Sequence, residues 1–136
     1  MVIDTNVWYS AFIYGGKPEK VVNYCLDYGK IYLSPEILEE LVKNLKNKAK
    51  TPYKWIRFVR LHLEKRCTVL DINVKPGVVR SYKDEHVVAL AVSSASAYVI
   101  TGDEDLLELG VYNGVNFIDS FEFLQLVTNQ KVNQGD

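Results

Sequence analysis

Short, largely apolar strand segments alternate along this sequence with longer segments of helical periodicity. The predicted strands cover residues 2–4, 31–33, 69–72, 98–101 and 115–118. Strands that are apolar along their whole length are buried on both faces, which is typical of a parallel sheet between layers of helices. The sequence therefore predicts an α/β fold, with a parallel sheet covered by helices on both faces.

Helical spacing of apolar residues occupies most of the chain between these strands. Pro18, Pro35 and Pro52 each suit the first turn of a helix, and Ser34 is a predicted N-cap. Further helices are predicted from Asp84, from just after Asp103, and over residues 121–127, with a loop through residues 76–77. The predicted domain covers residues 1–128, and residues 129–136 form a polar C-terminal tail.

Composition places the chain among ordinary single-domain proteins. It has 136 residues, 48% apolar and 24% charged, which excludes disordered and fibrous classes. No apolar run reaches the roughly 18–20 residues of a membrane helix, and the start lacks signal-peptide features. A cytoplasmic protein without membrane association is the expectation. Cys25 and Cys67 are too isolated for a zinc site or a disulfide framework, and are expected to be core thiols.

Basic charge is concentrated between residues 43 and 66. This segment carries nine basic residues and one acid, interleaved with Tyr53, Trp55 and Phe58. The pattern is typical of a nucleic-acid footprint. The alternative is a solvated helix face whose aromatic side chains point into the core. The candidate nucleic-acid-binding residues are Lys46, Lys50, Lys54 and Arg57.

Acidic residues follow the predicted strands at one edge of the predicted sheet. Ligands of parallel α/β sheets bind outside the carboxyl ends of the strands. Asp4 ends the first strand, Glu40 lies in the helix after the second, and Asp84 begins the helix before the fourth. Asp103 follows the fourth strand, with Asp105 close behind it. These acids are the candidate site residues.

Each acid also has a structural interpretation. Asp84 and Asp103 could be helix N-caps. Glu40 could be an exposed helix acid, as Glu36 and Glu39 are expected to be. Asp4 is harder to explain in this way, because a carboxylate directly after buried strand residues is costly to desolvate without partners.

If these acids converge, either some of them take up protons or a cation is recruited. Like charges about 4 Å apart repel by on the order of 4 kcal/mol at an effective dielectric near 20. Oxygen ligands without a nearby histidine or cysteine suit Mg²⁺ or Mn²⁺. Such an ion could bind a phosphate and orient a water for in-line attack, which is the chemistry of a nuclease.

Five segments of the chain, four of which contain the candidate acids, resemble a known family. They are residues 4–12, 15–18, 34–41, 84–91 and 101–107, in a match that spans about residues 1–127. In these segments the chain resembles the PIN-domain ribonucleases, and among them the VapC-like toxins of toxin–antitoxin pairs. The resemblance implies a three-layer PIN sandwich with strand order 3-2-1-4-5 and metal-dependent cleavage of RNA.

The resemblance also implies roles for particular residues and partners. Asp4, Glu40, Asp84 and Asp103 match the family's catalytic acids and would hold Mg²⁺ or Mn²⁺, and Asp105 matches a frequent extra metal acid. Asn6 and Ser10 match polar positions that could orient Asp4, and Thr101 matches one that could steady Asp103. The implied partners are an RNA substrate, a small antitoxin protein and a second copy of the chain in a homodimer.

One departure from the family pattern concerns the third acid. Relatives often carry Asp-Pro shortly before it, whereas Ser81, Tyr82 and Lys83 precede Asp84 here. One acid is lost, and the positive charge of Lys83 could weaken metal binding or contact the substrate phosphate. His62 and His86 are not expected to act in the chemistry.

Two other classes of α/β protein fit the sequence less well. A haloacid-dehalogenase-like site needs a second aspartate where Asn6 stands, and a receiver domain needs a lysine after the fifth strand, where Asp119 is found. Both are disfavoured. The stronger alternative is a non-catalytic PIN module that binds RNA or a protein without cleaving RNA.

Overall fold

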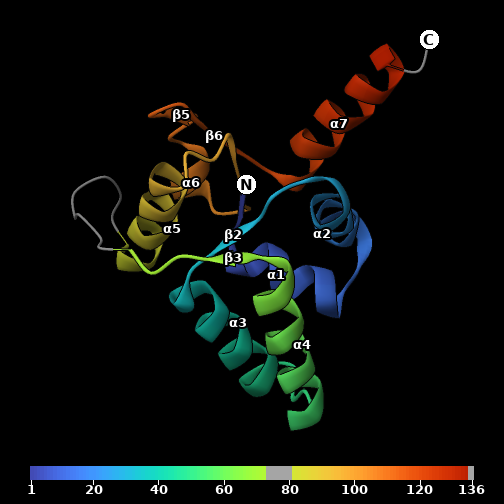
Figure 1. Cartoon of the computed structure of the whole chain (residues 1–136), viewed down its shortest axis with the longest axis vertical. Coiled ribbons are helices and arrows are strands. Elements are labelled where there is room, and N and C mark those ends of the chain that lie inside the picture. The colour runs from blue at the N-terminus through green and yellow to red at the C-terminus, as the bar shows by residue number, and fades with distance from the viewer. Residues whose placement is uncertain (73–80, 135–136) are drawn as a thin grey trace.

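A mostly parallel sheet forms the centre of the molecule (Figure 1). The computed structural model describes residues 1–72 and 81–134. Within them the strand order is β3-β2-β1-β4-β6-β5. The strands are β1 Val2–Ile3, β2 Tyr32–Leu33, β3 Thr68–Val69, β4 Tyr98–Ile100, β5 Val111–Tyr112 and β6 Val115–Ile118. The predicted order is confirmed, because the predicted fifth strand is β6, which pairs in parallel with β4.

Strand β1 occupies the middle of the sheet. Val2 pairs with Tyr32 of β2 and with Val99 of β4, and Ile3 pairs with Ile100. Val2 and Ile3 are both 0% exposed, as expected for a strand covered on both faces. The parallel pairing of β1 with β4 brings the residues that follow them to one edge of the sheet.

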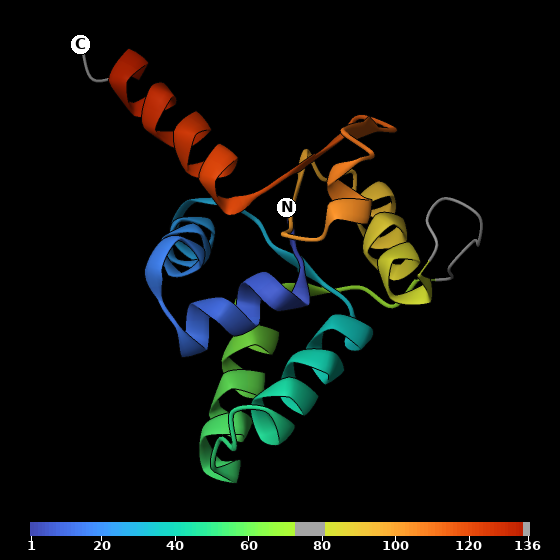
Figure 2. The ribbon, with the colours of Figure 1, turned by 180° about the vertical axis from the view of Figure 1, so that it is seen from behind.

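Helices lie on both sides of this sheet (Figures 1 and 2). Helix α5 packs against β1, β2 and β4. Helix α1 lies on the opposite side and packs against α2 and α3, while α3 and α4 extend away from the sheet as a pair (Figures 1 and 2). The helices are α1 Thr5–Ile13, α2 Gly16–Tyr28, α3 Pro35–Asn47, α4 Tyr53–Arg66, α5 Tyr82–Ser93, α6 Glu104–Leu107 and α7 Ser120–Gln134.

Local sequence signals account for several helix starts. Ser34 caps α3, accepting a hydrogen bond from the Ile37 amide at 3.1 Å, and Pro35 is the first helical residue, as predicted. Helix α5 begins at Tyr82 rather than at Asp84, because Ser81 is its N-cap. Helix α2 begins at Gly16, so Pro18 lies within its first turn.

Three further elements differ from the prediction. Helix α1 was not predicted, although Val7, Trp8 and Ala11 form its buried face. Strand β5 forms an antiparallel hairpin with β6 around Asn113 and Gly114, both at positive φ. Helix α7 continues to Gln134, beyond the predicted residue 127, and the domain boundary at residue 128 stays a prediction.

The two cysteines and the lengths of the apolar helices were both subjects of prediction from composition. Cys25 and Cys67 are buried free thiols, as predicted. In residues 1–72 and 81–134, no helix combines the length and apolar character of a membrane span. The predicted loop at residues 76–77 and the last two residues of the predicted tail lie outside the described part of the chain.

Candidate functional site

Asp4 is a buried carboxylate with two hydrogen-bond donors at the carboxyl end of β1. It is 1% exposed. Its Oδ1 accepts a bond from the Thr5 amide at 2.8 Å, and its Oδ2 accepts one from the Thr101 hydroxyl at 2.8 Å. Burial raises the pKa of Asp4, and the bond from Thr101 and the charge of Lys83 oppose that rise. The donors compensate for desolvation and fix the carboxylate in place.

Thr101 connects Asp4 to the acids after β4. While its hydroxyl donates to Asp4, its Oγ1 accepts a bond from the Asp103 amide at 3.0 Å. The Oδ1 of Asp103 in turn accepts a bond from the Asp105 amide at 2.9 Å, which makes Asp103 the N-cap of α6. The N-cap interpretation of Asp103 is therefore correct, and it still leaves oxygen atoms available to a ligand.

Three carboxylates converge beside this network. Asp84, Asp103 and Asp105 each offer one oxygen atom, and these atoms lie within 4.8 Å of one another. Burial, and then the negative charges of Asp103 and Asp4, raise the pKa of Asp84 to about 6. This group of carboxylates, called the acidic cluster below, suits a hard divalent cation such as Mg²⁺ or Mn²⁺, because every donor is an oxygen.

Glu40 lies at the site, but it forms an ion pair with Lys83. Its Oε1 is 2.5 Å from Nζ of Lys83. Burial lowers the pKa of Lys83, but the hydrogen bond to Glu40 and the charges of Glu40, Asp4 and Asp84 raise it by more. Lys83 therefore stays charged and places a positive group among the acids, and Glu40 is not one of the three converging residues.

Asn6 and Ser10 lie on α1, close to Asp4 in sequence. Asn6 is exposed and Ser10 is partly exposed. Among the residues that the structure describes, the donors to the Asp4 carboxylate are Thr5 and Thr101, and neither Asn6 nor Ser10 is a third. The role of the Thr5 amide as a donor to Asp4 was not predicted from the sequence. An N-cap at Asp4, at the end of the predicted first strand, would have indicated it.

The basic segment is displayed on the α3–α4 pair, away from the sheet (Figure 1). Tyr53, Trp55 and Phe58 are 77%, 53% and 59% exposed, so the alternative in which these aromatic side chains point into the core is wrong. The Nζ of Lys54 lies 5.5 Å from the centre of the Trp55 ring. The candidate RNA-binding residues Lys46, Lys50, Lys54 and Arg57 are all exposed.

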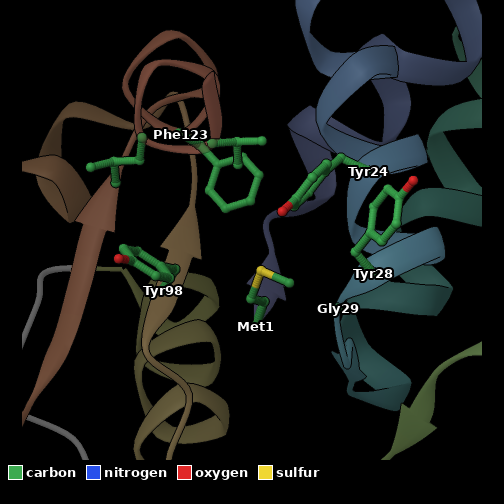
Figure 3. A pocket seen from close by; sticks show the side chains of 8 residues that line it. Met1, Tyr24, Tyr28, Gly29, Tyr98 and Phe123 are labelled. Atoms are coloured by element: carbon green, nitrogen blue, oxygen red, sulfur yellow. The ribbon is translucent and has the colours of Figure 1, made fainter. Parts of the chain in front are cut away.

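An apolar cavity lies near the amino ends of β1 and β4, away from the acids (Figure 3). It has a volume of about 180 Å³ and is lined mainly by aromatic and apolar side chains, among them Tyr24, Tyr98 and Phe123. The Phe123 ring packs edge-on to both tyrosine rings, with centres 5.9 Å and 6.1 Å apart. No carboxylate lines it among the described residues, so the acidic edge of the sheet is the better candidate for catalysis.

Comparisons with known proteins identify a family and a shared fold. A family model described as a PIN domain matches residues 1–105. Among solved structures, a chain from the crystal structure of VapBC2 from Rickettsia felis, bound to a DNA fragment from their promoter, matches with a TM-score of 0.59 and 13% identity. The match covers 87% of this chain and 96% of that one, and at this identity it shows a shared fold. No curated protein matches the sequence.

Proposed function

Because the chain belongs to the PIN domain family, we propose that it is a metal-dependent ribonuclease that hydrolyses phosphodiester bonds at the acidic cluster. The observation that carries this proposal is the convergence of Asp84, Asp103 and Asp105 within 4.8 Å. Asp4 lies beside them, held by Thr101. Such a concentration of negative charge is unfavourable in an empty protein and favourable around a divalent cation.

The acidic cluster and Asp4 would hold Mg²⁺ or Mn²⁺, with Glu40 at the margin of the site. When bound, a divalent cation binds the phosphate, neutralises its charge and makes a water more acidic. Hydrolysis forms a bond from the water oxygen to phosphorus as the bond to the leaving ribose oxygen breaks. The water loses one proton, and the leaving oxygen takes one up.

The residues of the chain itself would orient the acids and the substrate. Thr101 keeps Asp4 and the Asp103 backbone in one fixed arrangement, because its hydroxyl bonds to both. The ammonium group of Lys83, held by Glu40, offers positive charge to a substrate phosphate at the edge of the site. The exposed Lys46, Lys50, Lys54 and Arg57 would contact flanking RNA phosphates through charge.

We further propose that the chain is the toxin of a toxin–antitoxin pair and acts in the cytoplasm as a homodimer. Support comes from the fold shared with a chain of the VapBC2 complex, and from the exposed aromatic and apolar residues of α4, which a protein partner would cover. A small antitoxin is the expected partner.

Cleavage of mixed single-stranded RNA oligonucleotides tests the ribonuclease. Cleavage should require Mg²⁺ or Mn²⁺, stop with EDTA, and fall at least about a hundredfold in Asp4→Asn and Asp103→Asn, because they remove charge from the site. Glu104→Gln is a matched control, since Glu104 is exposed between Asp103 and Asp105. RNA binding without metal-dependent cleavage would favour the non-catalytic module, and equal cleavage by the aspartate variants would reject the proposed site.

A further inference from the structure

A small pocket lies beside the acidic edge of the sheet, between the start of α1 and the first turns of α3 and α5. Its volume is about 140 Å³. Thr5, Glu36, Ile37, Tyr82, His86 and Val87 line it, and the Glu40–Lys83 ion pair forms one border. Sites for drug-sized ligands have volumes of roughly 300–1,000 Å³, so this pocket has room for one flat ring system rather than a whole nucleotide.

Several buried polar atoms around this pocket have no partner. They are Oγ1 of Thr5, both ring nitrogens of His86 and Oε2 of Glu36, and none of them forms a hydrogen bond to another described residue. Thr5 is 0% exposed and His86 is 5% exposed. Buried polar atoms without partners are rare in folded proteins, because each loses its bonds to water without replacement.

A hydrogen bond between His86 and Glu36 would not supply partners for all of these atoms. Nδ1 of His86 lies 3.7 Å from Oε2 of Glu36, which is too long for a hydrogen bond. A small movement could close that distance, but the other ring nitrogen and the Thr5 hydroxyl would still lack partners. The residues around the pocket therefore have hydrogen-bonding capacity that they do not use among themselves.

The charges around the pocket favour a neutral, polar and flat ligand. A phosphate inside the pocket is disfavoured, because two carboxylates, those of Glu36 and Glu40, line it against the one ammonium group of Lys83 at its border. Ile37 and Val87 supply apolar walls, and the exposed ring of Tyr82 lies at the mouth, 4.5 Å from the His86 ring centre. An aromatic heterocycle with polar edges matches these surfaces.

We propose that this pocket binds a guanine base of the RNA substrate next to the cleaved phosphate. This inference rests on the proposed ribonuclease function. Guanine carries two adjacent N–H donors, at N1 and N2, that a carboxylate such as Glu36 accepts together. His86 and Thr5 supply groups for the remaining ring atoms. Thr5 follows Asp4 and Lys83 precedes Asp84, so a base in the pocket has its phosphate beside the acids.

Binding of short RNAs without metal separates this inference from catalysis. Pentanucleotides of uridine with a central guanosine, inosine, adenosine or uridine are titrated in EDTA by fluorescence anisotropy. The guanosine oligonucleotide should bind about tenfold more tightly than the uridine one, since one bidentate base contact discriminates by about that factor or more. Inosine lacks the N2 amino group and should lose most of the preference.

Two glutamates of α3 provide the variant and its control. Glu36→Gln should abolish the guanosine preference, because glutamine replaces one of the two acceptor oxygens with an NH₂ donor, which cannot pair with a second N–H donor. Glu39→Gln also removes one negative charge, at an exposed position paired with Arg60, and should keep the guanosine preference. Circular dichroism confirms that both variants are folded.

The outcomes distinguish the two proposals. Equal affinity for all four oligonucleotides, or a preference that survives Glu36→Gln, overturns the guanine pocket, whether or not the protein cleaves RNA. A guanosine preference that depends on Glu36, in a protein without metal-dependent cleavage, supports the pocket and overturns the ribonuclease.

Discussion

A single hydroxyl group, on Thr101, connects the two sides of the candidate site through hydrogen bonds. Thr101 is 0% exposed and bonds both to the Asp4 carboxylate and to the Asp103 amide. Asp4 cannot obtain a replacement from water, because it is itself buried. The position of the carboxylate and the start of α6 therefore depend on the same side chain.

Replacing that hydroxyl should impair both stability and activity. Thr101→Val keeps the shape but removes one donor and one acceptor, so it should destabilise the protein by about 2–3 kcal/mol in urea unfolding. Any metal-dependent cleavage should fall as well, because Asp4 loses its orientation. Thr68→Val is the control, since Thr68 is exposed on β3. Equal effects of the two variants would contradict a special role for Thr101.

The raised pKa of Asp84 predicts a stability that depends on pH in the metal-free protein. The folded state binds the proton of Asp84 more tightly than the unfolded state, so stability should decrease as pH rises from about 4 through about 6. The difference for this group is at most about 3 kcal/mol, since one pKa unit equals about 1.4 kcal/mol.

Urea unfolding in EDTA at pH 5 and pH 7 measures this dependence. The native protein should be more stable at pH 5 than at pH 7, and Asp84→Asn should remove much of that difference. Glu104→Gln, which removes a charge at an exposed position, should keep it. A native protein that is instead more stable at pH 7, in this metal-free buffer, would show that the acids do not repel one another in the folded state.

At the scale of elements, the sequence predicts best those features that depend on neighbouring residues. The strand positions follow from apolar runs, and the α3 start follows from Ser34 and Pro35. The β5–β6 hairpin was also predictable, because Asn-Gly at residues 113–114 is the typical signal for a two-residue turn. The missed α1 has a mixed pattern, in which aromatic residues such as Phe12 stay exposed beside buried Trp8.

Contacts between distant elements were less accessible to prediction. The acids were placed at the correct edge, because parallel strands present their carboxyl ends together. The Lys83–Glu40 ion pair instead requires the approach of α5 to α3, which no local pattern encodes. The same limit applies to the pocket of Glu36 and His86, since Glu36 was expected to be an ordinary exposed acid.

Helix caps at the site give a prediction on the scale of elements. Ser34→Ala should cost about 1 kcal/mol of stability, because the buried Ser34 hydroxyl accepts the Ile37 amide at 3.1 Å. Ser81→Ala should cost less, since the corresponding bond in α5 is 3.4 Å long and only partly buried. Thermal or urea unfolding of both variants measures the order, and the reverse order would show that these hydrogen bonds do not set the cap strengths.

The whole molecule separates its charges into two regions. Nine basic residues lie between residues 43 and 66, on and around the α3–α4 pair, while Asp4 and the acidic cluster lie at the sheet edge. Long-range attraction would bring the proposed RNA substrate to the basic surface, but the acids would repel its phosphates unless their charge is compensated. A divalent cation would remove this conflict and should also change the stability of the fold.

Metal binding should raise the melting temperature of the whole protein. A ligand that binds only the folded state stabilises it by about 2.7 kcal/mol at a hundred times its dissociation constant. For a domain of this size that corresponds to a shift of several degrees, roughly 2–6 °C per kcal/mol. Millimolar Mg²⁺ or Mn²⁺ should produce such a shift by calorimetry, and Asp103→Asn should abolish it. Glu108→Gln, at an exposed position after α6, should retain it. A shift of the same size in Asp103→Asn would place the bound ion away from the acidic cluster.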